Sequence, residues 1–164
     1  MQMADLVTPE CVACNVKVHS KKRVFELLAE LLAKNQHELT QAEIMESLLA
    51  RERLGSTGLG HGVAIPHGRM KKLNRAVGAF VQLEKGIDFD AIDNQPVDLL
   101  FVLLVPEKCT DEHLQILAGL AEMLGDEVMR DKLHAAKSCE ELYRLVGAQV
   151  KQGQGTDTSR MTHA

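Results

Sequence analysis

Apolar residues recur at helical spacing in the first third of the chain. Residues 21–34 carry them three or four positions apart, and Ser20 stands directly before this run as a helix cap. The apolar stripe consists of Val24, Leu27, Leu28, Leu31 and Leu32. A second helix is predicted from Thr40, where Glu43 completes a capping box, to about Arg51. We therefore expect two amphipathic helices, the second ending at the edge of a glycine-rich loop.

The middle of the chain has the pattern of β-strands. Residues 75–83 are rich in β-forming types, and residues 97–105 are so continuously apolar that we expect them in the centre of a sheet covered on both faces. A further apolar strand is predicted at residues 63–65. The segment 86–96 contains several Asp and Asn residues, which indicates turns around a short strand at residues 87–89.

Helical spacing returns in the last part of the chain. Thr110 can cap a helix that ends at Gly125 and whose apolar face consists of Leu114, Leu117, Leu120 and Leu124. Two more helices are predicted at residues 126–136 and 138–149, the last opened by a capping box of Ser138 and Glu141.

The order of these elements predicts one layered domain. Strands in the middle and helices around them favour an α/β fold of three layers, in which a mixed central β-sheet is flanked by helices on both faces. We expect residues 1–150 to form this domain. Residues 151–164 lack apolar periodicity and predict a disordered tail.

Composition narrows the possible functions. The 164 residues are 45% hydrophobic and 26% charged with a formal net charge of −4, which is ordinary for a globular domain and gives no basic footprint for nucleic acid. With no Trp and one Tyr, the chain also lacks an obvious platform on which bases could stack. Binding to nucleic acid is therefore not expected.

The termini and apolar runs predict a cytoplasmic protein. The amino terminus contains Asp5 and no basic segment followed by an apolar core, so we find no secretory signal. The run from Leu99 to Val105 is far shorter than the roughly 20 residues that span a bilayer. We expect no membrane insertion.

The four cysteines predict neither a disulfide framework nor a metal site. In a chain of this length without a secretory signal, reduced thiols are the expected state. Cys11 and Cys14 form a C-x-x-C, but Cys109 and Cys139 do not supply the second pair that a zinc ribbon needs.

Residues 55–69 form the most unusual segment, with five glycines, two hydroxyl residues and two histidines. Such a density of glycine is expected where backbone N–H groups approach a ligand closely or adopt positive φ. The loop has neither the P-loop motif nor the glycine pattern of a dinucleotide site. A nest of N–H groups with the hydroxyls of Ser56 and Thr57 suits a phosphoryl oxygen. The alternative is that the glycines only shape a tight loop.

His67 is the candidate nucleophile of this segment. Pro66 fixes its own φ and keeps Ile65 extended, so we expect His67 to be held rigidly at the end of a strand. A neutral imidazole can accept a phosphoryl group on one nitrogen while the other is held by a hydrogen bond. Arg51 could bind the phosphoryl oxygens, and His113, in the first turn of its helix, could donate a ring N–H. On residue type alone, all three could instead be structural or solvated.

Metal ligation is the weaker interpretation of these residues. Zinc could be bound by three histidines of the chain, His61, His67 and His113, but they lack the close spacing of zinc ligands. The acidic residues at 88–93 lack the glycine and terminal Glu of a calcium loop. We predict no metal and no cofactor, and we assign no function to His61.

The run from Arg51 to Gly68 resembles a known signature. It reads Arg-Glu-x-x-Gly-Ser-Thr-Gly-x-Gly-x-Gly-Val-Ala-Ile-Pro-His-Gly, which is similar to that of the fructose/mannitol-type IIA domains of the bacterial phosphoenolpyruvate-dependent phosphotransferase system. Residues 75–83 and 89–106 resemble the nitrogen-regulatory members of this family. The resemblance covers about residues 5–148.

The resemblance implies a phosphoryl carrier. His67 is then phosphorylated on its tele nitrogen and takes the phosphoryl group from a phosphohistidine on an HPr-like carrier protein. Arg51 and His113 match the two supporting active-site positions of the family, whose fold is a mixed central sheet sandwiched by helices. The phosphoryl-binding loop is predicted to contain Ser56, Thr57, Gly58, Gly60, Gly62 and Gly68.

Three roles follow for such a protein. The favoured one is a regulator whose phosphorylation state controls its binding to other proteins, which in this family include potassium-transport and sensor-kinase targets. The alternative is a sugar-specific IIA component that passes the phosphoryl group to a separate IIB. The third is an interaction module with an inert His67, which the presence of Arg51, His67 and His113 argues against.

Overall fold

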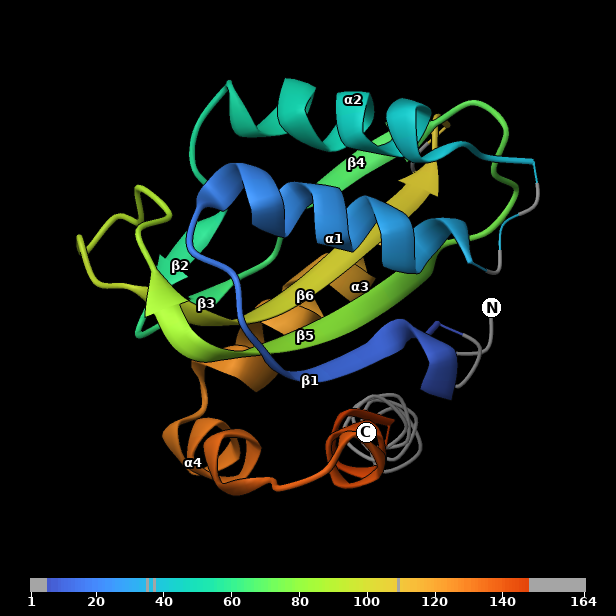
Figure 1. Ribbon diagram of the computed structural model, residues 1–164. Coiled ribbons are helices and arrows are strands. Elements are labelled where there is room, and N and C mark those ends of the chain that lie inside the picture. Colours follow the sequence, from blue (N-terminus) through green and yellow to red (C-terminus); the bar gives the residue numbers. More distant parts are fainter. Residues whose placement is uncertain (1–5, 35, 37, 109, 148–164) are drawn as a thin grey trace, which may run out of the picture.

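A six-stranded mixed sheet forms the middle layer of the molecule (Figure 1). The computed structural model describes residues 6–34, 36, 38–108 and 110–147. The strand order is β1-β5-β6-β3-β2. Strand β4 pairs with β6 on the same side as β3, but further along β6. The strands are β1 (Val12–Val16), β2 (Gly58–Gly60), β3 (Val63–Ala64), β4 (His67–Met70), β5 (Val77–Ile87) and β6 (Val97–Pro106).

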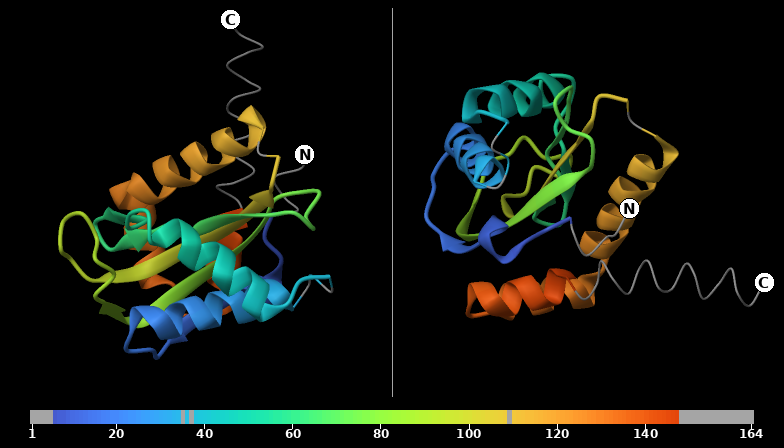
Figure 2. Two further views of the ribbon diagram at one scale, coloured as in Figure 1. Left: turned by 90° about the horizontal axis from the view of Figure 1, so that it is seen from above. Right: turned by 90° about the vertical axis from the view of Figure 1, so that its right-hand side faces the viewer.

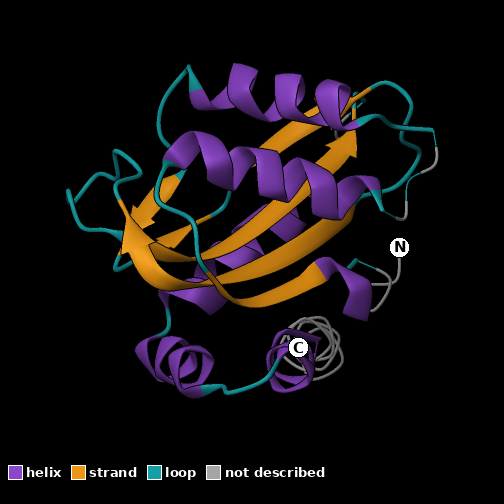
Figure 3. Cartoon of the chain, in the orientation of Figure 1, coloured by secondary structure: helices purple, strands orange, loops and turns teal. Residues whose placement is uncertain are grey.

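Helices cover both faces of this sheet (Figures 2 and 3). On one face α1 packs on β5 and α2 on β4, and on the other α3 packs on β6. A short 3₁₀ helix, η2, precedes β1, and α4 and a helix at residues 139–147 follow α3. The labelled helices are η2 (Pro9–Cys11), α1 (Lys21–Ala33), α2 (Gln41–Glu52), α3 (Asp111–Gly125) and α4 (Glu127–Ala135). The predicted three-layer α/β fold is confirmed.

The helices begin where the capping residues predicted them to begin. The hydroxyls of Ser20 and Thr40 accept hydrogen bonds from backbone N–H groups three residues later, at 3.2 and 3.1 Å. The hydroxyl of Ser138 does the same for the helix at residues 139–147, at 3.1 Å. These side chains satisfy N–H groups that have no partner within the helix.

Strand β6 lies in the centre of the core, as its apolar sequence predicted. It runs antiparallel to β5 and parallel to β3 and β4. Six consecutive residues, from Leu99 to Leu104, are at most 1% exposed. The ring of Phe101 lies 6.3 Å from that of Phe80 on β5, in a tilted aromatic pair. Burial on both faces explains why this strand shows no alternation of apolar and polar residues.

Two predicted details are wrong. The separate strand expected at residues 87–89 does not form, because β5 continues to Ile87 through an irregularity in its pairing with β6 after Gln82. The expected apolar face of α3 is right at Leu120 and Leu124 but is shifted by one position in the first two turns. Its buried residues are His113, Ile116, Leu120 and Leu124, whereas Leu114 is 54% exposed. The face is shifted because the buried ring of His113 occupies the position in the first turn that Leu114 was expected to take.

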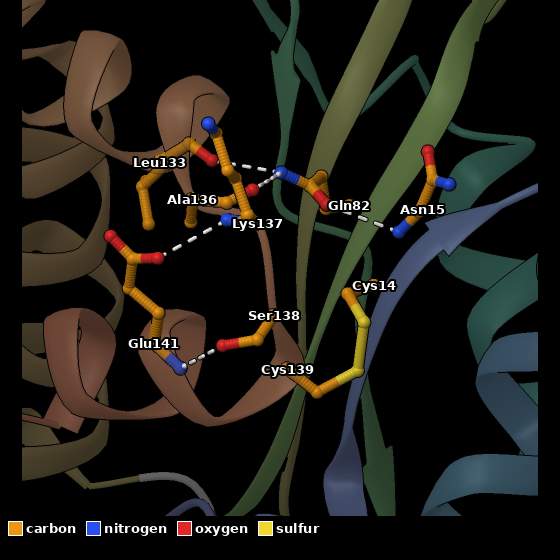
Figure 4. Close-up of a disulfide and its surroundings, with 9 residues drawn as sticks. All are labelled: Cys14, Asn15, Gln82, Leu133, Ala136, Lys137, Ser138, Cys139 and Glu141. Atoms are coloured by element: carbon orange, nitrogen blue, oxygen red, sulfur yellow. Dashed lines mark hydrogen bonds between the residues drawn. A yellow bond between two sulfur atoms is a disulfide. The ribbon is translucent and has the colours of Figure 1, made fainter.

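The expectation of reduced thiols is wrong for two of the four cysteines. Cys14 on β1 and Cys139 at the start of the helix at residues 139–147 form a disulfide (Figure 4). They are 125 positions apart, so no local spacing in the sequence could reveal the pair. Cys109, residues 148–149 and the predicted tail at residues 151–164 lie outside the described residues.

Gly78 on β5 packs so closely against β6 that a side chain would have no room. A Cβ atom at Gly78 would lie 2.8 Å from the Phe101 ring and 3.1 Å from the carbonyl oxygen of Val102. We expect Gly78→Ala to reduce the free energy of unfolding by about 1–3 kcal/mol, because neither the ring nor the backbone can move freely. Urea unfolding followed by circular dichroism measures the change.

Gly119 offers the matched control. It lies on α3, and a Cβ atom there would meet nothing within 4 Å. Gly119→Ala should therefore raise the free energy of unfolding by about 0.5–1 kcal/mol through its helix propensity. Equal effects of the two substitutions would contradict the close packing at Gly78.

Candidate functional site

The site lies where β6 changes its pairing partner from β3 to β4. Val63 pairs with Leu99, and His67 pairs with Leu103 four positions further along β6. Between the two strands, the carbonyl of Pro66 accepts a hydrogen bond from the Leu103 N–H at 3.0 Å. This contact keeps the chain beside β6 through the break.

His67 is therefore the first residue of β4, and the prediction that it ends a strand is wrong. Strand β3 ends at Ala64, and the Ile65 N–H donates to the carbonyl of Thr57 at 3.1 Å. Pro66 has no N–H to offer. The expected rigid mount is nevertheless present, since backbone hydrogen bonds hold the residues on both sides of Pro66.

The His67 ring is fixed by its own backbone. Its Nδ1 lies 2.8 Å from the carbonyl oxygen of Ile65. A carbonyl only accepts hydrogen bonds, so Nδ1 carries the proton and Nε2 keeps a lone pair. The ring is half-buried, so Nε2 is the nitrogen that can act as a nucleophile.

The surroundings keep this imidazole neutral. Burial lowers the pKa of His67 below its usual value, because the charged form loses solvation. The hydrogen bond to Ile65 raises the pKa, Arg51 lowers it, Glu52 raises it, and Arg69 lowers it. Because the net effect is a lowered pKa, the neutral and nucleophilic form of His67 dominates at neutral pH.

Arg51 reaches the site from the last turn of α2. Its Nη1 donates to the carbonyl of Gly55 at 2.9 Å, which bends the guanidinium over the loop that follows the helix. A cation is favourable at this end of a helix. The positive charge of Arg51 lowers the pKa of His67, because it disfavours the imidazolium form.

His113 stands at the amino end of α3 and is 8% exposed. Its Nδ1 accepts a hydrogen bond from the Thr110 N–H at 3.1 Å, so the ring proton is on Nε2. A Cβ atom at Gly68 would strike Ser47 on α2, so Gly68 faces α2 and its neighbour His67 faces the opposite side of the sheet. That is the side that α3 covers.

The predicted phosphoryl loop is held by its own side chains. The Ser56 hydroxyl donates to the carbonyl of Phe89 at 3.0 Å and accepts from the Gly58 N–H at 3.1 Å. The N–H and hydroxyl of Thr57 both donate to the carboxylate of Glu52, at 3.0 and 2.6 Å. Both hydroxyls thus shape the loop.

Gly60 and Gly62 lie in a different setting. Both have positive φ, and Cβ atoms there would approach the carboxylates of Asp93 and Asp98 at 3.3 and 3.2 Å. The exposed His61 between them occupies the turn from β2 to β3, and its N–H donates to Asp93. Carboxylates beside these two glycines make this end of the loop unfavourable for an anion.

Glu52 is a site residue that the sequence analysis missed. Its carboxylate is buried and, besides Thr57, contacts Lys21 Nζ on α1 at 3.0 Å. The Lys21 ammonium also lies 4.6 Å from the centre of the Phe89 ring. The sequence does hold one indication, because a carboxylate in the last turn of a helix opposes the helix dipole and needs a compensating partner.

Neither a metal centre nor a membrane span is found among the described residues. No three His, Cys, Asp or Glu side chains of this part of the chain gather as metal ligands, so His61, His67 and His113 do not form a zinc site. None of its helices is long and apolar enough to cross a bilayer.

Comparison with known proteins assigns the family. Residues 5–148 match the family described as "Phosphoenolpyruvate-dependent sugar phosphotransferase system, EIIA 2". The chain belongs to this family. A nitrogen regulatory protein of Escherichia coli (strain K12) is 49% identical over 147 residues, 89% of this chain and 90% of the relative. A nitrogen regulatory protein of Pseudomonas aeruginosa is 46% identical over 154 residues, 94% of this chain and 99% of the relative.

The type-2 EIIA fold is also found among solved structures. The nitrogen regulatory protein IIA-Ntr of Neisseria meningitidis superposes with a TM-score of 0.83 at 41% identity. The match covers 90% of this chain and 98% of that protein. The mixed sheet and its flanking helices are thus shared along nearly the whole described length.

The lowered pKa of His67 predicts a titration that can be measured. We expect its ring resonances in NMR spectra to titrate below the usual histidine range. Arg51→Ala should raise this pKa and Arg51→Lys should leave it low, because the nearby positive charge disfavours the imidazolium. The pKa of His67 is lower in the folded protein than in the unfolded chain. Between these two pKa values the unfolded chain binds the proton more readily, so His67 makes the fold less stable as pH falls. A His67 pKa at or above the usual histidine value would contradict the description of this ring as a desolvated, neutral imidazole.

Removing the Glu52 carboxylate should loosen the loop. We expect Glu52→Ala to lower the free energy of unfolding by about 1–3 kcal/mol, because the buried donors of Thr57 lose their acceptor. Glu46→Ala, at an exposed position of the same helix, should change it by less than about 0.5 kcal/mol. Urea unfolding of both variants measures the difference, and equal values would refute the role of Glu52.

Proposed function

We propose that this chain is a phosphoryl carrier of the nitrogen-regulatory branch of the phosphotransferase system. In this proposal Nε2 of His67 accepts a phosphoryl group from a phosphohistidine on an HPr-like carrier protein in the cytoplasm. The observation that carries the proposal is the hydrogen bond from Nδ1 of His67 to the carbonyl of Ile65, which leaves Nε2 as the nucleophile.

The transfer exchanges one phosphorus–nitrogen bond for another. The bond to the donor histidine breaks as the bond to Nε2 forms, and the neutral donor imidazole leaves. Charge in the transition state is spread over three phosphoryl oxygens, which calls for donors that are already in place. The Arg51 guanidinium supplies a planar fork, and the Nε2–H of His113 supplies a second donor.

The remaining loop residues receive different roles. The loop is supported by the hydrogen bonds of Ser56, Thr57 and Gly58. Gly68 allows β4 to lie close against α2. The N–H groups of Thr57 and Gly58 already donate to Glu52 and to the Ser56 hydroxyl, so they also have less support as phosphoryl contacts. Gly60 and Gly62 have less support as phosphoryl contacts because of the carboxylates beside them.

Phosphorylation would serve as a regulatory switch. It adds close to two negative charges at a half-buried residue, so a partner surface that covers His67 experiences a changed charge directly. We infer that the target proteins are regulatory, such as a potassium transporter or a sensor kinase. The relatives that bear the name nitrogen regulatory protein along almost their full length support this role.

A sugar-specific IIA component is the second candidate. The family as a whole is described by its part in sugar phosphotransfer, which favours onward transfer from His67 to a separate IIB. Both candidates share the same chemistry at His67. They differ in which carrier supplies the phosphoryl group and which protein responds to it.

Phosphotransfer in vitro tests the proposal. We expect phosphoenolpyruvate, enzyme I and a nitrogen-branch carrier to add one acid-labile, base-stable phosphoryl group, detected by intact mass. His67→Ala should abolish this addition, because no other nucleophile takes the place of Nε2. His61→Asn is the matched control, since Asn tolerates the positive φ at this position, and it should leave uptake unchanged.

The choice of carrier separates the two candidates. Faster uptake from the nitrogen-branch carrier than from the sugar-branch carrier supports the regulatory role, and the reverse preference favours the sugar-specific one. Uptake by a folded His67→Ala variant, with folding checked by circular dichroism, would overturn the assignment of the acceptor.

A further inference from the structure

Cys14 and Cys139 join the edge of the sheet to the last described helix. Cys14 lies on β1, the outer strand on one side of the sheet, and Cys139 is the first residue of the helix at residues 139–147 (Figure 4). Their sulfur atoms are bonded, and their Cα atoms are 5.1 Å apart. That separation lies within the range of protein disulfides.

We propose that Cys14 and Cys139 are a reversible redox modification site that fastens the last helix to the edge strand when oxidised. The site is independent of the phosphoryl chemistry of His67. The proposal requires that the fold hold the two thiols close together when they are reduced. It also requires that small thiol reagents can reach them and that Cys11 lie apart from them.

The two segments are held together by contacts that do not involve sulfur. Leu142 and Val146 of the last helix are fully buried in the core. The Nε2 of Gln82 on β5 donates to the carbonyl of Leu133 at 2.9 Å and also to that of Ala136. These contacts anchor the chain just before Cys139, so reduction leaves both thiols beside each other and ready to bond again.

The same glutamine also holds the strand that carries Cys14. Its Oε1 accepts a hydrogen bond from the Asn15 N–H at 3.0 Å, one residue after Cys14. Gln82 is itself 8% exposed, so its bonds are shielded from water. One buried side chain therefore bonds to the segments that precede Cys139 and follow Cys14 (Figure 4).

Exposure distinguishes this pair from its neighbour. Cys14 and Cys139 are both partly exposed, as attack by a small disulfide or thiol requires. Cys11, only three positions before Cys14, is buried and directs its thiol at the carbonyl of Leu31 on α1. The fold thus presents Cys14 to the last helix and keeps Cys11 away from it.

The oxidant we name is a low-molecular-weight disulfide such as glutathione disulfide. One protein thiolate attacks it, which forms a mixed disulfide and releases one glutathione thiolate. The second protein thiolate then displaces the other glutathione and closes the Cys14–Cys139 bond. Two electrons pass from the protein to glutathione, and the two protons lost by the protein thiols end on the two glutathione thiols.

The expected consequence is greater stability without a change in phosphoryl uptake. A bond across 125 positions constrains the unfolded chain strongly, which predicts a rise in melting temperature of about 10 °C on oxidation. Strands β5 and β6 separate β1 from β4, which carries His67. The rate of phosphoryl uptake should therefore differ by less than about twofold between the two forms.

The test equilibrates the full-length protein in buffers of defined ratios of reduced to oxidised glutathione. After the remaining thiols are blocked with a maleimide, trypsin should release residues 1–17 linked to residues 138–144 in the oxidised protein. Fragmentation then separates Cys14 from Cys11 within the first peptide. Thermal melts of the same samples should show the rise on oxidation.

Substitutions provide the controls. Cys14→Ser and Cys139→Ser should each remove the linked peptides and the difference between oxidised and reduced melts. Cys11→Ala should keep that difference, whatever it does to the overall melting temperature. Because the wild-type protein is itself measured in both states, the result does not depend on the folding of any variant.

Three outcomes would overturn the proposal. These are the absence of the linked peptides at every ratio, a link through Cys11 or Cys109 instead, and a bond that excess dithiothreitol cannot reduce in the folded protein. Loss of phosphoryl uptake in both redox states would count against His67 as the acceptor and would leave the cysteine pair standing.

Discussion

The pairing of β6 is the constraint on which the rest of the structure depends. A strand buried on both faces must pair its backbone groups with neighbours, because water cannot reach them. On one side β5 runs the length of the strand, but on the other the chain satisfies β6 in two pieces, β3 and β4. The break between these pieces falls at Ile65 and Pro66, and it is the reason that His67 stands at a fixed place beside the core.

The chemistry of the site follows from this placement. A histidine that begins a strand beside a buried neighbour loses solvation, and its Nδ1–H donates a hydrogen bond to the carbonyl of Ile65. Burial lowers the pKa of His67 and so favours the neutral ring, whereas the hydrogen bond to Ile65 raises this pKa. The same hydrogen bond holds the proton on Nδ1, so the neutral ring offers Nε2 as its nucleophile. The buried carboxylate of Glu52 then stabilises the adjacent loop from the side of α1 and α2.

Much of the fold could be predicted because its determinants are local. Capping residues such as Ser20 and Thr40 mark the starts of helices, and the apolar run of β6 marks a central strand. Predictions that depended on a single position were weaker. Only the start of the buried face of α3 was misplaced, because the prediction considered only Leu, whereas the ring of His113 fills the first turn.

The site could be predicted only in part, for a related reason. Glycines and a histidine behind a proline are visible in the sequence, so the loop and His67 attract notice. Nothing in the sequence distinguishes Gly58, supported by the Ser56 hydroxyl, from Gly60, which faces the carboxylate of Asp93. That difference arises from the turns at residues 88–96, which only the folded chain brings back against the loop.

Strands β1 and β4, which are separated by β5 and β6, carry different kinds of chemistry. In our proposals, His67 on β4 would meet another protein, whereas Cys14 on β1 would need to meet only a small thiol reagent. Because β5 and β6 lie between these two strands and most of their residues are buried, a change at β1 should be transmitted only weakly to His67. Under both proposals, a covalent clamp between β1 and the last helix would form or break without disturbing the geometry at His67. The sheet thus separates the stability of the carrier from its chemistry.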